Sequence, residues 1–238
     1  MTPLDAIAGW LGPQEWEAVR LSLLVSACAT VLSLPPAILV AQALARGRFW
    51  GWSALNALVH LPLILPPVVT GYVLLLAFGR NGPLGAFLQE TFGLTLAFRW
   101  TGAVLAAAVM AFPLTVRAIR LSIEAVDPRL DAAAATLGAG PLRVWATITL
   151  PLIAPGVLAG AIIGFAKAMG EFGATITFAA AIPGETLTVP SAIHAALQVP
   201  GGEDRVYRLV LVSLVLSLGA ILASEALAAR FARRRARA

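Results

Sequence analysis

Long hydrophobic blocks alternate with short polar or glycine-bearing stretches along most of this chain. A helix needs about 20 apolar residues to cross the hydrocarbon core of a bilayer. Five blocks satisfy that requirement, so we predict an all-α membrane protein in which residues 1–238 form a single transmembrane domain. The five predicted spans cover residues 19–45, 52–78, 99–120, 152–178 and 206–228.

The amino-acid composition excludes an ordinary soluble domain. Hydrophobic residues make up 59% of the chain, charged residues make up 12%, and the mean hydropathy is +0.87. Soluble domains carry about 25% charged residues. The net charge of +5 comes almost entirely from arginine, and on a membrane protein such a surplus indicates topology rather than nucleic-acid binding.

The arginines also predict which loops face the cytoplasm, because cytoplasmic loops of membrane proteins carry an excess of Lys and Arg. They gather in three places: at Arg46 and Arg48, at Arg117, Arg120, Arg129 and Arg143, and in the tail from Arg230 onward. Five spans then put the N-terminus outside, residues 80–98 and 183–204 outside, and the C-terminus in the cytoplasm. The tail is interpreted as a solvated stop signal near anionic lipid.

Two further segments are too short or too polar to be full spans. Met1–Trp16 lacks the basic residues of a cleavable signal peptide, and we expect it to lie at the outer interface as an amphipathic segment. Residues 186–199 are expected to form a partly buried outer segment. Whether either segment enters the membrane stays open.

The longest helical stretch that cannot span a bilayer covers residues 124–151. Asp127 followed by Pro128 is typical of a helix start, and Gly138 is typical of a helix end with a left-handed turn. Gly140 and Pro141 then predict a second short helix that leads into the fourth span. The stretch therefore predicts a helix, a tight turn and a helix outside the membrane. Its pattern alone is consistent with a docking element or with a mere connector.

The second block cannot be a regular helix, because Pro62, Pro66 and Pro67 remove backbone donors and kink the axis. Broken backbone at membrane depth is tolerated where it is buried in protein or lines a water-filled cavity. Pro66, Pro67 and the nearby Thr70 are therefore candidates for a transport pathway or its gate. The alternative is a kink that serves helix packing.

The fourth block holds two charged residues, Lys167 and Glu171, four positions apart and so on one face of a helix. Counted from Pro155 at about 1.5 Å per residue, Lys167 lies roughly 18 Å into the bilayer, where charges are costly and by default mark a functional or paired position. Thr175 and Thr177 follow and could donate hydrogen bonds to an anion. A pathway site and a structural Lys–Glu pair are both consistent with this pattern.

Two stretches carry a resemblance to a known family. The first resembles the cytoplasmic loop of ABC-importer permeases, with nine residues between its glycine and its isoleucine as in that family; it comprises Ala132, Ala133, Ala134, Gly138, Ile148, Leu150 and Pro151. The acidic position of that loop holds Ala132 here, with Asp131 one residue earlier. The second stretch, residues 170–178 with 182–186, is similar to a signature of the molybdate-type permeases, as is the proline-rich string of residues 61–76.

The resemblance implies a MetI-like permease fold in the bacterial inner membrane and a homodimer around one pathway. It also implies a separate ATP-binding subunit dimer that docks on the cytoplasmic loop, and an extracytoplasmic binding protein that delivers molybdate. Tungstate or sulfate transport by the same machinery is the alternative that the sequence leaves open. An ion-coupled secondary transporter is disfavoured, because only Glu171 is a clear intramembrane carboxylate and no internal repeat is evident.

The chain itself is predicted to be neither an enzyme nor a metal protein. It lacks the glycine-rich phosphate loop that ends in Lys-Ser or Lys-Thr, so ATP and Mg²⁺ are expected to bind the partner subunit, with no cofactor in this chain. Cys28 is the only cysteine, and no Cys/His ligand spacing is present. Paired carboxylates or histidine clusters that would suit a membrane enzyme are also missing from the sequence.

Overall fold

The computed structural model describes residues 10–47 and 49–235, with the side chains of the last helix described up to residue 219 and at Leu222. All regular elements in these ranges are helical, as the hydrophobic blocks predict. The helices are α2 Pro13–Arg46, α3 Trp52–Ile64, α4 Pro67–Phe78, α5 Pro83–Phe92, α6 Trp100–Glu124, α7 Pro128–Thr136, α8 Pro141–Val144, the π-helix η1 Trp145–Thr149, α9 Leu150–Met169, α10 Gly173–Phe178, α11 Val189–Leu197 and α12 Glu203–Arg235.

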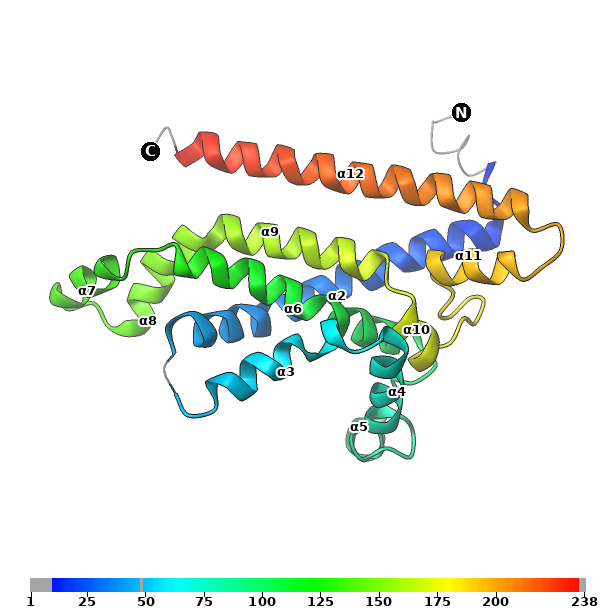
Figure 1. Cartoon of the computed structure of the whole chain (residues 1–238), viewed down its shortest axis with the longest axis horizontal. Helices are drawn as coiled ribbons and strands as arrows, with labels where there is room; N and C mark the ends of the chain where they lie inside the picture. Colours follow the sequence, from blue (N-terminus) through cyan, green and yellow to red (C-terminus); the bar gives the residue numbers. More distant parts are fainter. Residues whose placement is uncertain (1–9, 48, 236–238) are drawn as a thin grey trace.

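Four long helices, α2, α6, α9 and α12, run along the longest axis of the molecule (Figure 1). Small residues form much of the packing between α2, α6 and α9. One buried cluster joins Val25 and Ala29 of α2 to Ala103 and Ala107 of α6 and to Ala168 of α9. Small side chains let helix backbones approach closely, which favours association of helices in a membrane.

Two glycines of α9 allow this helix to pack closely on α6. A Cβ atom on Gly160 would lie 3.0 Å from the Ile119 side chain and 3.1 Å from the carbonyl oxygen of Thr115. A Cβ on Gly164 would lie 2.5 Å from the hydroxyl of the same threonine. The backbone of α9 therefore packs directly on α6, and larger side chains at these two positions would push the helices apart.

Among the described residues, three helical segments are long and apolar enough to cross a membrane: Pro13–Arg46, Trp100–Glu124 and Pro141–Met169. A fourth span is counted if the bent pair α3 and α4 is taken as one. The predicted span 206–228 falls within the helix α12, but the described side chains of α12 are too few to test it. An all-helical membrane protein is confirmed, whereas a total of five spans stays a prediction.

The second block departs most from the predicted single span over 52–78. Its helix stops at Leu65 and Pro66, and α4 leaves at 117° to α3. Pro66 and Pro67 cannot donate to a continuing helix, so the break predicted from the prolines is confirmed. The bend exceeds a right angle, so α4 turns back instead of extending α3, and a single span over 52–78 stays a prediction.

The fourth block also has different limits from the predicted 152–178. Helical structure is continuous from Pro141 to Met169, so the short helix predicted after Gly140 runs through α8 and η1 directly into α9. At the other end α9 stops at Met169, and α10 starts after a break at residues 170–172. Gly170, which ends the helix, is poorly suited to a helix interior.

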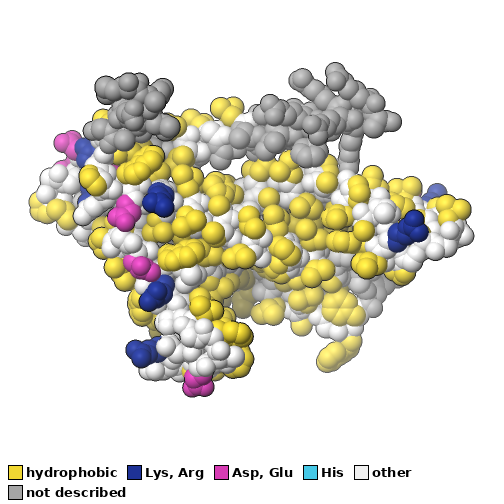
Figure 2. Space-filling view, turned by 180° about the vertical axis from the view of Figure 1, so that it is seen from behind, with side chains coloured by type: hydrophobic (Ala, Val, Ile, Leu, Met, Phe, Trp, Pro, Cys, Tyr) yellow, Lys and Arg dark blue, Asp and Glu magenta, His cyan; other side chains and the backbone are white. Residues whose placement is uncertain are grey.

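Side-chain chemistry is divided along the long axis (Figure 2). On the face shown, hydrophobic side chains cover the middle of the molecule, and charged side chains gather toward its two ends. One end carries α7 and α8, and the other carries α11 and the start of α12. This division is consistent with helices that cross a membrane between two aqueous sides.

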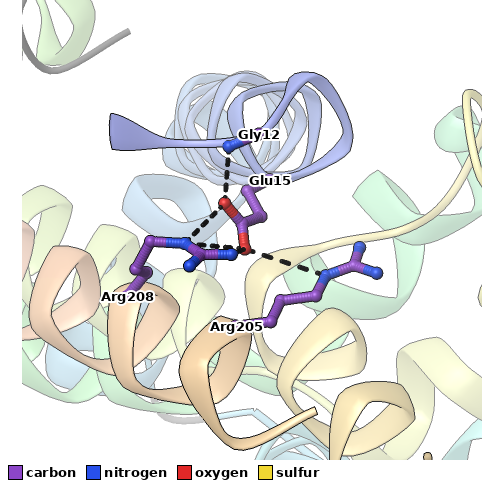
Figure 3. A network of polar contacts seen from close by, with 4 residues as sticks. All are labelled: Gly12, Glu15, Arg205 and Arg208. Carbon is purple, nitrogen blue, oxygen red and sulfur yellow. Dashed lines mark hydrogen bonds and ion pairs between the residues drawn. The ribbon is translucent and has the colours of Figure 1, made fainter. Parts of the chain in front are cut away.

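A charged network holds α2 and α12 together at the end that carries α11 (Figure 3). Arg208 donates from Nη2 to Oε1 of Glu15 over 2.7 Å, and Nε of Arg205 lies 4.0 Å from the same oxygen. The backbone N–H of Gly12 donates to Oε2 over 2.6 Å. Glu15 is 3% exposed, so this part of the expected interfacial segment is packed into the protein; residues 1–9 of that segment lie outside the described residues.

Candidate coupling loop and translocation site

The predicted helix and tight turn are present over residues 128–140, and the second helix starts at Pro141 as predicted but continues without a break into α9. The Asp127 side chain accepts a hydrogen bond from the backbone N–H of Arg129 over 2.9 Å, and Pro128 occupies the first turn of α7. Gly138 has a φ angle of +83°, the left-handed conformation expected at the end of this helix. Gly140 precedes Pro141, the first residue of α8. Local sequence signals thus determine the shape of this loop.

The loop presents apolar side chains to its surroundings. No residue of α7 is buried, and Leu137 and Leu142 on either side of the turn are 88% and 79% exposed. Leu130 of α7 is also exposed. These leucines were not among the predicted site residues, although their positions beside Gly138 and Pro141 are a signal that the sequence contains. Strongly exposed leucines on either side of a tight turn make this loop a candidate protein-binding surface.

The predicted coupling residues divide into two groups. Ala132, Ala133, Gly138 and Pro151 are exposed, as a docking surface requires. Ala134 and Ile148 are half-buried, and Leu150 is half-buried against the core cluster that α2 and α6 share.

Asp131 turns toward its own chain: Thr149 donates to its Oδ1 over 3.1 Å, and Nη2 of Arg46 lies 3.8 Å from its Oδ2. In this conformation its carboxylate links α7 to α2 and to the entry of α9.

The two broken blocks meet in space. A Cβ atom on Gly71 of α4 would lie 2.6 Å from the carbonyl oxygen of Ala174 and 2.8 Å from Cβ of Thr177, both in α10. A Cβ on Gly173 would lie 2.6 Å from Cβ of Pro67. Only hydrogen atoms fit at these glycines, so α4 packs backbone to backbone on α10. The structure therefore brings together two regions that the sequence marks separately.

Buried hydroxyl groups lie on both sides of this contact. Thr70 of α4 is 6% exposed, and its hydroxyl has no hydrogen-bond partner among the described residues. Thr175 of α10 is buried, and Thr177 donates to the carbonyl oxygen of Gly173 over 2.9 Å. A buried polar group without a partner is costly, so Thr70 is a candidate donor to a ligand at this contact.

Lys167 and Glu171 form an ion pair at the break between α9 and α10. Nζ of Lys167 lies 2.7 Å from Oε2 of Glu171, whose side chain is 2% exposed. The other carboxylate oxygen accepts the backbone N–H of Ala174 over 3.0 Å. Glu171 therefore neutralises the lysine and satisfies one of the free N–H groups at the start of α10. The lysine side chain remains 30% exposed, which leaves it accessible from one side.

The chain matches, over residues 21–237, the protein family described as the inner membrane component of binding-protein-dependent transport systems. It belongs to that family. The molybdenum transport system permease protein ModB of Escherichia coli is 55% identical over 222 residues, which cover 93% of this chain and 96% of that protein. The predicted resemblance to ABC-importer permeases of the molybdate type is thereby confirmed.

Solved structures agree on the fold. A bacterial ABC transporter that imports the acidic polysaccharide alginate superimposes with a TM-score of 0.74 at 17% identity, over 97% of this chain and 84% of that chain. An inward-facing MetNI methionine ABC transporter superimposes with a TM-score of 0.65 at 14% identity, over 97% and 99%. At these identities the likeness concerns the fold alone, and it confirms the MetI-like architecture.

Proposed function

We propose that this chain is the membrane-spanning subunit of an ATP-driven importer that moves molybdate across the bacterial inner membrane. The observation that carries the proposal is the 55% identity to a molybdenum transport permease over nearly the whole length of both chains. The exposed coupling loop and the two broken helices in contact give that identity a physical basis. A homodimer, a pair of ATP-binding subunits and an extracytoplasmic binding protein complete the proposed machine.

In this proposal the loop of α7 and α8 docks into a cleft on the ATP-binding subunit. Leu137 and Leu142 supply apolar contact area, and Ala132 and Ala133 let the partner approach the helix backbone closely. ATP-driven closure of the partner subunits would move the loop. The continuous helix from Pro141 to Met169 would carry that movement to the break that holds Lys167 and Glu171.

The contact between α4 and α10 is the proposed gate of the pathway. A dianion must exchange its hydration shell for donors or positive charge to pass, because an isolated buried ion is strongly penalised. Thr70, Thr175 and Thr177 offer hydroxyl donors, and Lys167 offers charge. Pro66 and Pro67 break the second helix beside them, so that irregular backbone faces the same region. Sparse donors of this kind would bind the ion weakly and release it readily.

Uptake measurements test the proposed function. Cells without a permease of their own should regain molybdate uptake when they express this chain with its ATP-binding subunit and binding protein. Uptake should cease with a partner subunit that cannot hydrolyse ATP, and tungstate should compete more strongly than sulfate. Uptake that persists without ATP hydrolysis and follows an ion gradient would contradict the proposal, and preferential competition by sulfate would reassign the substrate.

The proposed topology makes a separate prediction. In a Cys28→Ala background, Glu90→Cys of α5 should react with a membrane-impermeant thiol reagent in intact cells, whereas Thr136→Cys of α7 should react only after the cells are opened. Both wild-type side chains are exposed, so accessibility within the protein does not explain a difference. Labelling of Thr136→Cys from outside would show that the coupling loop is not cytoplasmic.

A further inference from the structure

Arg46, the last residue of α2, reaches across to the end of α6. Its Nη2 donates to the carbonyl oxygen of Val126 over 3.0 Å and to that of Ile123 over 3.5 Å. A cation at this place is favoured by the partial negative charge of a helix C-terminus. One guanidinium therefore joins the ends of two long helices on the side of the molecule that carries α7.

The same guanidinium also contacts the coupling loop. Its Nη2 lies 3.8 Å from Oδ2 of Asp131 in α7. The other oxygen of Asp131 accepts from the hydroxyl of Thr149, which is buried at the end of η1, where α9 begins. No residue of α7 is fully buried, and Asp131 supplies a direct polar connection between this helix and the spans.

These contacts are suited to transmitting movement rather than to stabilising the fold. The side chains of Arg46 and Asp131 are 23% and 33% exposed, and ion pairs as accessible as this one contribute little to stability. Their geometry is nevertheless specific, because one guanidinium and one carboxylate connect α7 to α2, α6 and α9. A displacement of α7 would act on all three helices through two side chains.

A buried donor of Arg46 and a buried acceptor of Gln42 are unsatisfied in the part of the chain that the structure describes. Nε of Arg46 and Oε1 of Gln42 are both buried without a hydrogen-bond partner among the described residues. Residues four apart on a helix lie on the same face, so the donor and the acceptor are one turn apart on α2. If the guanidinium swung away from Asp131, Nε could be satisfied by Gln42. Such a movement would break the connection to α7.

We propose that Arg46 and Asp131, with Thr149, form an intrachain joint that transmits movement of the coupling loop to the spans α2, α6 and α9. The proposal rests on the proposed docking of that loop on an ATP-binding subunit. It assigns Asp131 to the joint instead of the docking surface, and it adds Arg46 and Thr149 as positioning residues for transport. If the joint is lost, the complex should still hydrolyse ATP but should no longer transport molybdate.

The test uses the whole complex of permease, ATP-binding subunit and loaded binding protein in proteoliposomes, with molybdate as substrate. Arg46→Gln and Asp131→Asn should each keep copurification of the ATP-binding subunit and ATP hydrolysis. Molybdate moved per ATP hydrolysed should fall about tenfold, within the range typical of coupling between sites. The double variant should be no worse than either single one, because both changes break the same connection.

Arg117→Gln is the matched control, since it removes the same charge near the same end of α6 from an exposed side chain; it should leave the ratio unchanged. Normal transport per ATP in Arg46→Gln overturns the joint. Weakened copurification in Asp131→Asn also overturns it, because Asp131 would then be a docking residue. If Arg46→Gln fails to reach the membrane, Asp131→Asn and Thr149→Val decide by the same ratio.

Failure of the joint and failure of the proposed function are distinguishable. Docking of the loop is tested by copurification of the ATP-binding subunit with a Gly138→Val variant, which leaves Arg46, Asp131 and Thr149 in place. Normal copurification there would count against the docking, whatever the ratio in Arg46→Gln. A normal ratio in Arg46→Gln would count against the joint even if the loop docks.

Discussion

Replacement of Gly138 by valine should abolish molybdate uptake and weaken copurification of the ATP-binding subunit, while the permease still accumulates in the membrane. The φ angle of this residue is +83°, a conformation that β-branched residues rarely adopt. Strain of about 1–3 kcal/mol at such a position would shift the turn and with it the exposed leucines on either side. Because nothing lies within 4 Å of a Cβ built here, the effect would come from the backbone and not from a clash.

Two controls separate loop geometry from general backbone strain. Gly138→Asn should keep most uptake, since asparagine tolerates the left-handed conformation better than valine does. Gly201→Val carries the same strain at a φ of +79°, also with open space around the Cβ, but it lies in the loop between α11 and α12 at the opposite end of the molecule. Gly201→Val should leave copurification unchanged. Normal uptake and normal assembly in Gly138→Val would show that the loop is a connector.

The shape of this loop could be predicted because its determinants are local. The Asp127 cap, Pro128 in the first turn and the left-handed glycine each act within a few residues of the sequence. The same holds for the long hydrophobic blocks, whose length alone indicates membrane spans. No long-range contact needs to be known to place these elements.

The course of the second and fourth blocks could not be predicted, because it depends on contacts between them. Prolines indicate that the second helix breaks, but its 117° turn depends on the support that α10 gives to α4. Likewise, a spacing of four residues suggests that Lys167 and Glu171 share a helix face. In the structure Glu171 lies beyond the end of α9 and accepts from the N–H of Ala174, a role that becomes visible only with the break.

The inward turn of Asp131 has the same origin. The sequence alone predicts Asp131 to be a charged residue on an exposed helix, next to the acidic position of the family loop. Its partners, Arg46 and Thr149, are 85 and 18 positions away and are brought to it by the packing of α2 and the entry of α9. Contacts between residues so far apart in the sequence cannot be predicted from local patterns.

Replacement of Lys167 by methionine should cut molybdate transport at least ~10-fold, equivalent to about 1.4 kcal/mol of transition-state stabilisation, with much smaller effects on complex assembly and basal ATP hydrolysis. Lys167→Arg should keep part of the transport, because it preserves the charge. The physical reason is that Lys167 is the only lysine in the chain and is paired with Glu171 at the break that precedes α10. Its side chain is 30% exposed, so an ion at the proposed gate could reach it.

If Lys167 and Glu171 form only a structural ion pair, a different outcome is expected. The geometry shows which double variant distinguishes this alternative from a pathway role for Lys167. Methionine at position 167 leaves the buried carboxylate of Glu171 without its cation, and an uncompensated buried charge is strongly destabilising. Adding Glu171→Gln removes that charge but keeps a side-chain oxygen for the N–H of Ala174, which now bonds to Oε1 over 3.0 Å. Glu171→Leu would remove the charge and this hydrogen bond together, so glutamine is the cleaner partner.

If Lys167→Met with Glu171→Gln restores transport, the lysine serves only to balance the glutamate, and the pathway role is wrong. If the double variant assembles normally with its ATP-binding subunit and still fails to move molybdate, the charge of Lys167 acts on the ion itself.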